Sequence, residues 1–366
     1  MTKPHEIPEY SVATIRGKVV LHSGFDGQVI EQSSDASTII QRAIDLLPRN
    51  GGKIYLAAGE YILNETIRIV DKHGIHLEGV SRGILFSGNK QGTVLRSEKN
   101  IDLVEVYGKT LKIAGTTISN LYVIGSGTRN GKAGILVNGC SDLLTLYNVG
   151  ANNCEIGFHF LGDGAMMDPH TIDFPQMYFC DGQVNSTGMR IERAHYMQIV
   201  GSGFSDCLEY GIFISGIDSK SIICPKINSV SAVRNPKAGI YIGKYTEDVT
   251  VTGGTDTGGS SEGSGIVISG EGTNNVPVNV IVSQIHTYNN GQCGILVEAG
   301  KNVIIQGCIS SDHPHEWVPA PGFKKVDQRF GVKICRGADN VIVNSCISYG
   351  NSVGDIVDET KKARIS

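Results

Sequence analysis

The chain has 366 residues, a formal net charge of −4, and 47 glycines beside only 11 prolines. The near-balanced charge argues against nucleic acid or an anionic membrane surface as a partner, because both attract strongly basic proteins. The low proline content excludes a disordered Pro/Gly-rich chain, whereas the high glycine content predicts many short strands joined by tight turns.

The first ten residues contain no apolar stretch of the kind found in a secretory signal. No segment approaches the roughly 18 apolar residues that a membrane span needs. We therefore expect no membrane partner and a cytoplasmic or virion-associated location. The nine cysteines form no Cys-x-x-Cys pair, so we expect buried free thiols, no metal centre and no cofactor.

Residues 1–50 differ in pattern from the rest of the chain. Asp35 can cap a helix whose apolar residues recur at helical spacing up to Leu47, and the segment 48–52 stops it. One amphipathic helix before a β-rich body predicts an N-terminal α-helical cap on the open end of a solenoid. The expected organisation is this segment, a β-rich body over 51–357 and a C-terminal tail over 358–366.

A glycine followed by alternating apolar residues recurs throughout the body. The repeats begin at Gly134, Gly157, Gly188, Gly211, Gly239, Gly265, Gly294 and Gly331. Most intervals fit one coil of a three-faced solenoid, which needs roughly 22–30 residues, whereas a propeller blade needs roughly 40. The sequence thus predicts an all-β fold, a right-handed parallel β-helix solenoid. Asparagines four places before some of these glycines, such as Asn235 and Asn290, are expected to stack as a ladder between coils.

The segment after the predicted helix reads Gly51-Gly-Lys-Ile-Tyr-Leu-Ala-Ala-Gly-Glu-Tyr-Ile-Leu. This order of helix, Gly-Gly, strand, turn and second strand resembles the opening of the pectate-lyase-like superfamily of β-helix proteins. The superfamily includes glycan hydrolases, lyases, epimerases, inulin fructotransferases and phage tailspikes. The resemblance implies a polysaccharide or oligosaccharide as the partner, and it implies a possible homotrimer.

Strand alternation turns the residue two places after each glycine outward. His159, Arg190, Phe213 and Tyr241 then form one row on successive coils about 4.8 Å apart, with Glu192 beside Arg190. We interpret this row as a groove in which His159, Phe213 and Tyr241 bind substrate, the rings covering apolar faces of sugars. Glu192 would be an acid, base or nucleophile, and Arg190 a charge partner in catalysis. The alternative interpretation is an ordinary solvated ion pair.

Two intervals between repeats are over-long, and loops at solenoid turns usually build a binding wall. The first loop supplies Asp163 and Asp168, either of which can complete with Glu192 the carboxylate pair that glycoside hydrolysis needs. His170 in the same loop is a candidate catalytic base, and Asp173 is a candidate substrate-binding residue.

The second long interval carries Trp317, the only tryptophan. It lies too many coils away from His159 to serve the same site within one subunit. We expect Trp317 to bind substrate in the groove of a neighbouring subunit of a homotrimer.

Motifs of individual subfamilies help to choose among the activities that the resemblance implies. The sequence motifs of polygalacturonase-like enzymes are missing, and Arg190-Ile-Glu192 is the segment most similar to one of them. Asp168-Pro-His170 resembles the core motif of mannuronan C5-epimerases. The expected function is an enzyme of hydrolase or fructotransferase type that cleaves or rearranges a glycosidic linkage. One alternative is a uronic-acid polysaccharide lyase or C5-epimerase in which Arg190 or His170 abstracts the proton. Another is a non-catalytic glycan-binding structural protein such as a virion spike.

Overall fold

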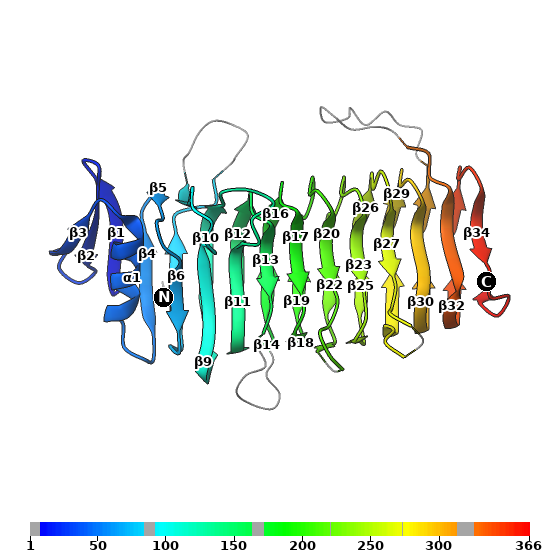
Figure 1. The fold of residues 1–366 in the computed structure, drawn as a ribbon, viewed down its shortest axis with the longest axis horizontal. Coiled ribbons are helices and arrows are strands. Elements are labelled where there is room, and N and C mark those ends of the chain that lie inside the picture. Colours follow the sequence, from blue (N-terminus) through cyan, green and yellow to red (C-terminus); the bar gives the residue numbers. More distant parts are fainter. Residues whose placement is uncertain (1–7, 84–91, 163–171, 220, 273, 313–325) are drawn as a thin grey trace, which may run out of the picture. The chain divides into compact units, whose positions relative to one another are not determined.

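The computed structural model describes residues 8–83, 92–162, 172–219, 221–272, 274–312 and 326–366 (Figure 1). The chain divides into two compact units. The first unit comprises Met1–Phe158 and Gly162–Asp181, and the second comprises His159–Leu161 and Gly182–Ser366. Each unit is built mainly from strands that pair in parallel with the strands of the next coil.

Three strands that the sequence did not predict precede the helix in the first unit. Strands β1 (Tyr10–Ile15), β2 (Lys18–Ser23) and β3 (Val29–Ser33) pair as antiparallel neighbours. Strand β1 also pairs in parallel with β4 (Gly52–Leu56). The N-terminal segment is therefore joined to the coils through a shared strand ladder.

Helix α1 (Ala36–Leu46) confirms the predicted helix and its cap. The Asp35 side chain accepts a hydrogen bond of 3.0 Å from a backbone N–H of the first turn, as N-cap residues do. At the other end, Lys72 Nζ donates to the carbonyl oxygens of Ile44 and Leu47 at 2.6 and 2.7 Å, which satisfies groups that a helix end leaves free. The residues with apolar side chains on its buried face are Ala36, Ile39, Ile40, Ala43 and Ile44. A role of this helix as the cap of the solenoid stays a prediction.

The coils of the first unit place strands in parallel ladders. One ladder contains β4, β7 (Ile75–Gly79), β10 (Thr117–Ile124), β12 (Thr145–Asn152) and β15 (Gln176–Tyr178). A second contains β6 (Ile67–Val70), β9 (Val104–Ala114), β11 (Ala133–Asp142) and β14 (Ile172–Asp173). Strands β5 (Gly59–Ile62) and β8 (Thr93–Arg96) pair with each other, and β8 pairs with β10.

The second unit contains the row of glycine-led strands that the repeats predict. In order along the ladder they are β17 (Thr187–Ile191), β20 (Tyr210–Ile214), β23 (Ala238–Ile242), β27 (Ser264–Ile268), β30 (Cys293–Gln306), β32 (Phe330–Asn344) and β34 (Gly354–Asp358). All neighbours in this row are parallel and in register, so each strand adds one coil.

Further ladders complete the coils of the second unit. One contains β19 (Gln198–Val200), β22 (Lys226–Asn228), β25 (Thr250–Thr252) and β28 (Val278–Ser283), continues into β30 and β32, and ends at β35 (Arg364–Ile365). Another contains β26 (Asp256–Gly258), β29 (His286–Tyr288), β31 (Ile309–Ser311) and β33 (Ile347–Tyr349). The short strands β18 (Ala194–His195), β21 (Ile222–Ile223) and β24 (Thr246–Glu247) pair in the same parallel manner. Strands β13 (Ile156–Phe160) and β16 (Asp181–Gln183) include residues of both units.

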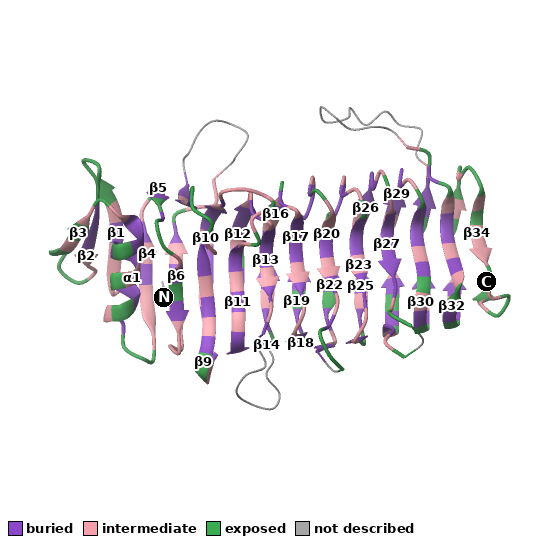
Figure 2. Ribbon diagram, in the orientation of Figure 1, coloured by how far each residue is buried: buried purple, intermediate pink, exposed green. Residues whose placement is uncertain are grey.

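The core follows the predicted alternation of side chains. In most glycine-led strands, the residue after the glycine and the one two places later are buried, while the residue between them is partly exposed, as the banding of strands in Figure 2 shows. In β27 all three of these residues are buried, whereas in β34 none of them is. Met189, Ile191, Ile212, Ile214, Ile240 and Ile242 all have 0% relative exposure. Their burial against the next coil removes apolar surface from water, which is the main stabilising contribution to a solenoid.

An asparagine ladder is present, but at a different turn from the one predicted. Asn279, Asn302 and Asn340 have φ values of 57°, 56° and 51°, and each donates its amide to the preceding coil: to Asp248, Asn279 and Asn302 respectively, at 2.8–2.9 Å. Asn235 instead bonds to the backbone of Phe204 and Cys207. At the same predicted turn, Asn290 accepts a hydrogen bond from the backbone N–H of Ser260 and donates to Gln328, so these two asparagines bond to backbone and glutamine groups.

No helix among the described residues is long and apolar enough to cross a membrane. Within the same residues, no cluster of three or more His, Cys, Asp or Glu side chains is arranged to hold a metal ion. The nine cysteines are free thiols; Cys224, Cys335 and Cys346 are partly exposed and the others are buried.

Candidate functional site

The outward row of the second unit is in register from coil to coil. Arg190 pairs with Phe213, Phe213 with Tyr241, and Tyr241 with Val267. The ladder then continues through Leu296 to Lys333. The structure thus places Arg190, Phe213 and Tyr241 on one strip, each directly above the next.

Glu192 is the centre of a charged cluster at one end of the row, which we call the triad: His159, Arg190 and Glu192. His159 Nε2 lies 2.8 Å from Glu192 Oε2, and Arg190 Nη2 lies 2.7 Å from Glu192 Oε1. The side chains of His159 and Glu192 are 14% and 13% exposed, whereas that of Arg190 is 41% exposed. Each carboxylate oxygen therefore has its own nitrogen partner in a partly dehydrated setting.

The backbone fixes Glu192 in this position. Its N–H donates to the carbonyl of Phe160, which directly follows His159, at 2.9 Å. On the other side, the carbonyl of Ile191 accepts from Ser215 N at 3.0 Å. The contact between His159 and Glu192 thus follows from the coil ladder, since residues 33 positions apart in sequence are brought side by side.

The electrostatics of Glu192 restrict its role. Burial acts to raise its pKa, but the hydrogen bond with His159 and the positive charge of Arg190 outweigh burial, so the pKa lies below the ordinary value of 4.5. Glu192 is consequently ionised at neutral pH. This favours base, nucleophile or orienting roles and disfavours the general-acid role that the sequence left open.

The aromatic rings next to the triad pack on one another. Phe213 and Tyr241 are stacked, with ring centroids 4.8 Å apart and planes 4° apart. The Arg190 guanidinium lies over the Phe213 ring, 5.3 Å from its centroid. Both contacts use ring faces of Phe213, so the expected covering of a sugar by that face does not fit this arrangement.

Tyr210 and Lys237 extend this aromatic cluster, and the sequence analysis missed both. The Tyr210 ring lies 5.0 Å from Phe213 and 5.7 Å from Tyr241, and Lys237 Nζ lies 5.4 Å from the Tyr210 centroid. Strand alternation predicts that Tyr210 lies on the same side as the buried Ile212. The sequence pattern therefore did not indicate that its ring contacts the outward residues Phe213 and Tyr241.

Asp173 belongs to the first unit, in strand β14. Its residue is only 8% exposed, and its carboxylate lies 2.5 Å from Lys112 Nζ. The ion pair with Lys112 accounts for the position of the Asp173 carboxylate. Because the residue is buried, the structure does not support the predicted contact of Asp173 with substrate. Asp163, Asp168, His170 and Trp317 lie outside the described residues.

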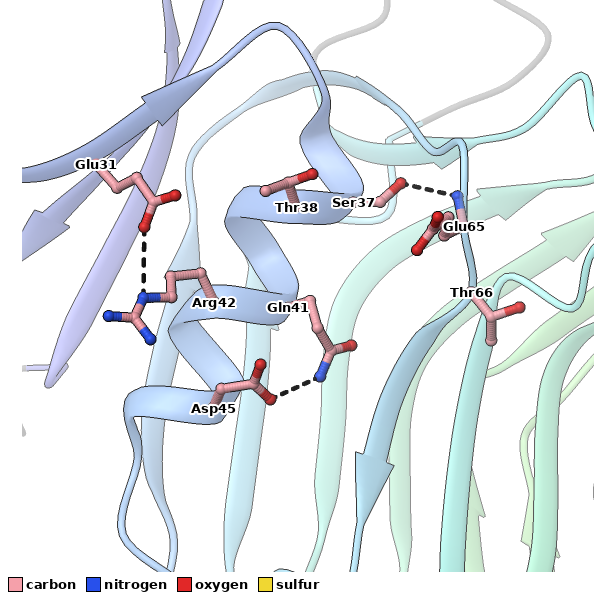
Figure 3. A pocket seen from close by; sticks show the side chains of 8 residues that line it. All are labelled: Glu31, Ser37, Thr38, Gln41, Arg42, Asp45, Glu65 and Thr66. Atoms are coloured by element: carbon pink, nitrogen blue, oxygen red, sulfur yellow. Dashed lines mark hydrogen bonds and ion pairs between the residues drawn. The ribbon is translucent and has the colours of Figure 1, made fainter.

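A separate cleft of about 300 Å³ lies beside helix α1 in the first unit (Figure 3). Its side chains are mostly bonded to one another or to the backbone: Glu31 to Arg42 at 3.3 Å, Gln41 to Asp45 at 2.9 Å, and Ser37 to the N–H of Glu65 at 3.0 Å. These bonds hold the helix against β3 and the segment before β6. We regard the cleft as a by-product of that packing.

The fold and the outward row define a parallel β-helix with a charged cluster at one end of an outward strip. Solved structures share this fold over most of the chain. A DFA-IIIase from Arthrobacter chlorophenolicus A6 in complex with GF2 is 12% identical with a TM-score of 0.67, and 90% of this chain and 90% of that chain are covered. The A-module of a mannuronan C-5 epimerase from Azotobacter vinelandii is 15% identical with a TM-score of 0.60, and 91% and 96% are covered.

The Dettilon tailspike protein is also similar, at 14% identity and a TM-score of 0.61 over 90% of this chain. The chain spans 59% of the length of that tailspike chain. No family model and no curated protein matches the sequence. At these identities the comparisons establish the fold alone: the chain has the right-handed parallel β-helix architecture that its repeats predict.

Proposed function

We propose that the chain acts on a polysaccharide or oligosaccharide and breaks or rearranges a glycosidic linkage at the triad. The observation that carries this proposal is an ionised carboxylate, Glu192, held between an imidazole and a guanidinium on a partly exposed strip. Similar folds support a carbohydrate as substrate, since they include a DFA-IIIase bound to GF2 and an alpha-1,3-glucanase bound to tetrasaccharides.

In this proposal Glu192 serves as base or nucleophile. A carboxylate that attacks or activates water must be ionised, and the lowered pKa of Glu192 provides that state. The matching acid is Asp163 or Asp168, which the sequence places in the loop after β13. Arg190 stabilises the charged form of Glu192, and its side chain, which is more exposed than that of Glu192, can contact an acidic or hydroxyl group of the sugar.

A second candidate is elimination or C5 epimerisation on a uronic-acid polysaccharide. It is favoured by the hydrogen bond between His159 and Glu192, because a carboxylate can hold an imidazole in the tautomer and orientation that proton abstraction needs. His159 or His170 would then abstract the C5 proton while Arg190 neutralises the uronate carboxylate. This route needs no second carboxylate.

The test is digestion of a panel of glycans, with products analysed by mass spectrometry, ultraviolet absorbance and NMR. Hydrolysis produces new reducing ends, elimination produces absorbing unsaturated ends, and epimerisation changes sugar configuration without cleavage. Glu192→Gln should lose at least about a hundredfold in kcat/KM. The matched control is Glu271→Gln, which makes the same change in an exposed ion pair with Lys244 outside the row.

If Glu192→Gln cleaves as fast as the wild type, the triad is not the reaction centre. If a glycan binds but no product forms, the chain is a glycan-binding structural protein such as a virion spike.

The role proposed for Trp317 requires a homotrimer. Sedimentation equilibrium of the full chain should give three times the monomer mass of 39.1 kDa. A strictly monomeric protein would remove that role and leave the triad proposal intact.

A further inference from the structure

Two cysteines occupy equivalent places in consecutive coils of the second unit. Cys308 directly precedes β31 and Cys346 directly precedes β33. The following residues, Ile309 and Ile347, are in register as parallel partners. The two cysteines therefore stack one above the other, at about the 4.8 Å spacing of neighbouring strands.

The surroundings of the two sulfur atoms are also equivalent. Each Sγ lies 3.4 Å from the carbonyl oxygen of the residue two places earlier. Each also contacts a carbonyl of the preceding coil, that of Val282 for Cys308 at 3.5 Å and that of Ile305 for Cys346 at 3.7 Å. Because Val282 and Ile305 are themselves partners in register, the two thiols point the same way and lie one above the other on consecutive coils.

The thiols differ in access to solvent and in acidity. Cys308 is 1% exposed, whereas Cys346 is partly exposed. The hydrogen bond with Cys308 lowers the pKa of Cys346 to about 6, and the same contact raises the pKa of Cys308. An accessible thiolate backed by a buried thiol is the arrangement of a nucleophilic cysteine with a resolving partner.

We propose that Cys346 and Cys308 form a redox-active dithiol site that hydrogen peroxide closes to a disulfide. The Cys346 thiolate attacks one peroxide oxygen, the O–O bond breaks, and hydroxide leaves, which oxidises Cys346 to a sulfenic acid. The Cys308 sulfur then attacks the Cys346 sulfur; the S–O bond breaks, the S–S bond forms, and the thiol proton and the departing hydroxide combine as water. The peroxide takes both electrons.

The stacking distance permits this bond. Disulfides join residues whose Cα atoms are roughly 4.4–6.8 Å apart, and a strand spacing of about 4.8 Å lies within that range. The cross-link would join the coil that contains β31 to the next coil, which contains β33. A thiol reductant would reopen it by exchange.

The test uses the full chain treated with one to a few equivalents of hydrogen peroxide. Thiol titration should show the loss of two thiols, and a non-reduced digest should contain the peptide of Cys308 joined to that of Cys346. Cys308→Ala should stop at a sulfenic acid that a dimedone probe traps on Cys346. The control is Cys224→Ala, which removes another partly exposed thiol, one whose pKa is raised by burial and by Asp248; this variant should still form the disulfide.

A second measurement does not depend on any variant. Alkylation of the wild type at pH 7, followed by peptide mapping, should label Cys346 roughly tenfold faster than Cys224 or more. Absence of the joined peptide after oxidation, a disulfide between other cysteines, or equal labelling of Cys346 and Cys224 would each overturn the proposal.

Discussion

The asparagine ladder and the outward row both run from coil to coil of the second unit but use their side chains in opposite ways. In the ladder, Asn279, Asn302 and Asn340 are like neighbours: Asn340 donates to Asn302, and Asn302 donates to Asn279. In the row, unlike neighbours follow one another: a guanidinium on Arg190, then the rings of Phe213 and Tyr241.

The difference separates side chains that hold coils together from side chains that can do chemistry. The ladder is exposed and neutral, so it bears little desolvation cost and its bonds are repeated from coil to coil. The triad removes a carboxylate from water, which is unfavourable unless it is fully paired. Because the triad interrupts the repeat and carries this desolvation cost, it is a better candidate for a functional site than the ladder.

The largest expected effect is a loss of activity, and we expect it for substitutions in the triad but not for substitutions in the ladder. His159→Ala should lower kcat/KM on the cleaved or epimerised glycan by roughly a hundredfold to ten-thousandfold, because it removes the group bonded to Glu192. Asn302→Ala, on the ladder, should leave kcat/KM within about twofold of the wild type. Equal losses in the two variants would show that the row and the ladder do not differ in function.

The next effect concerns stability against pH. The pKa of Glu192 is lowered in the folded state. The contribution of its charge to the free energy of unfolding is therefore complete at a pH above the pKa of the unfolded state, and it is lost as the pH falls through the pKa of the folded state. At neutral pH, Glu192→Gln should reduce the free energy of unfolding by about 2 kcal/mol. Urea unfolding at several pH values should show that difference shrinking below pH 4.5.

The exposed pair of Lys244 and Glu271 is the comparison for that experiment. In high salt, Glu271→Gln should have almost no effect on stability, since exposed pairs are screened. A pH-independent difference for Glu192→Gln would mean that its charge is not what stabilises the fold.

The ring contacts in the aromatic part of the row should contribute less to stability than the charge of Glu192. Phe213→Ala should lower the free energy of unfolding by about 1.5 kcal/mol beyond the simple loss of buried area, because it removes the stack with Tyr241 and the contact with Arg190. Phe213→Leu keeps most of the volume and should isolate the ring contribution. Chemical denaturation of both variants measures the difference.

The smallest effect is expected in the ladder. Asn302→Ala removes the bonds to Asn279 and from Asn340 and should lower the free energy of unfolding by about 1 kcal/mol. Asn302→Gly removes the same bonds but tolerates the φ of 56° at this position. A glycine variant as stable as the wild type would mean that the amide bonds of the ladder contribute nothing.

The fold was predictable because its signal is local. Glycine-led alternation in strands such as β20 and β23 specifies which side chains are buried, and stacking of the strands then brings Phe213 over Tyr241. The helix cap at Asp35 is equally local. The row of the candidate site could be predicted for the same reason.

Features that depend on turn conformation could not be predicted. Left-handed turn positions are occupied by residues as different as Leu143, Tyr196, Arg234 and Asn302. A residue type therefore does not mark the position, and the ladder was expected at Asn235 instead. The hydrogen bond of His159 with Glu192 depends on how residues on different coils meet at a turn, which alternation within one strand does not specify.

The parallel register of the row also bears on how such a chain can change in length. Tyr241 pairs with Val267, and Val267 with Leu296. A deletion that begins at Val267 and ends just before Leu296 would remove one whole coil. Tyr241 would then pair with Leu296, and every inward side chain would still point inward. Insertion of a duplicated coil would do the reverse. The span of the strip beyond Tyr241 can thus be lengthened or shortened by single recombination events while the triad keeps its geometry.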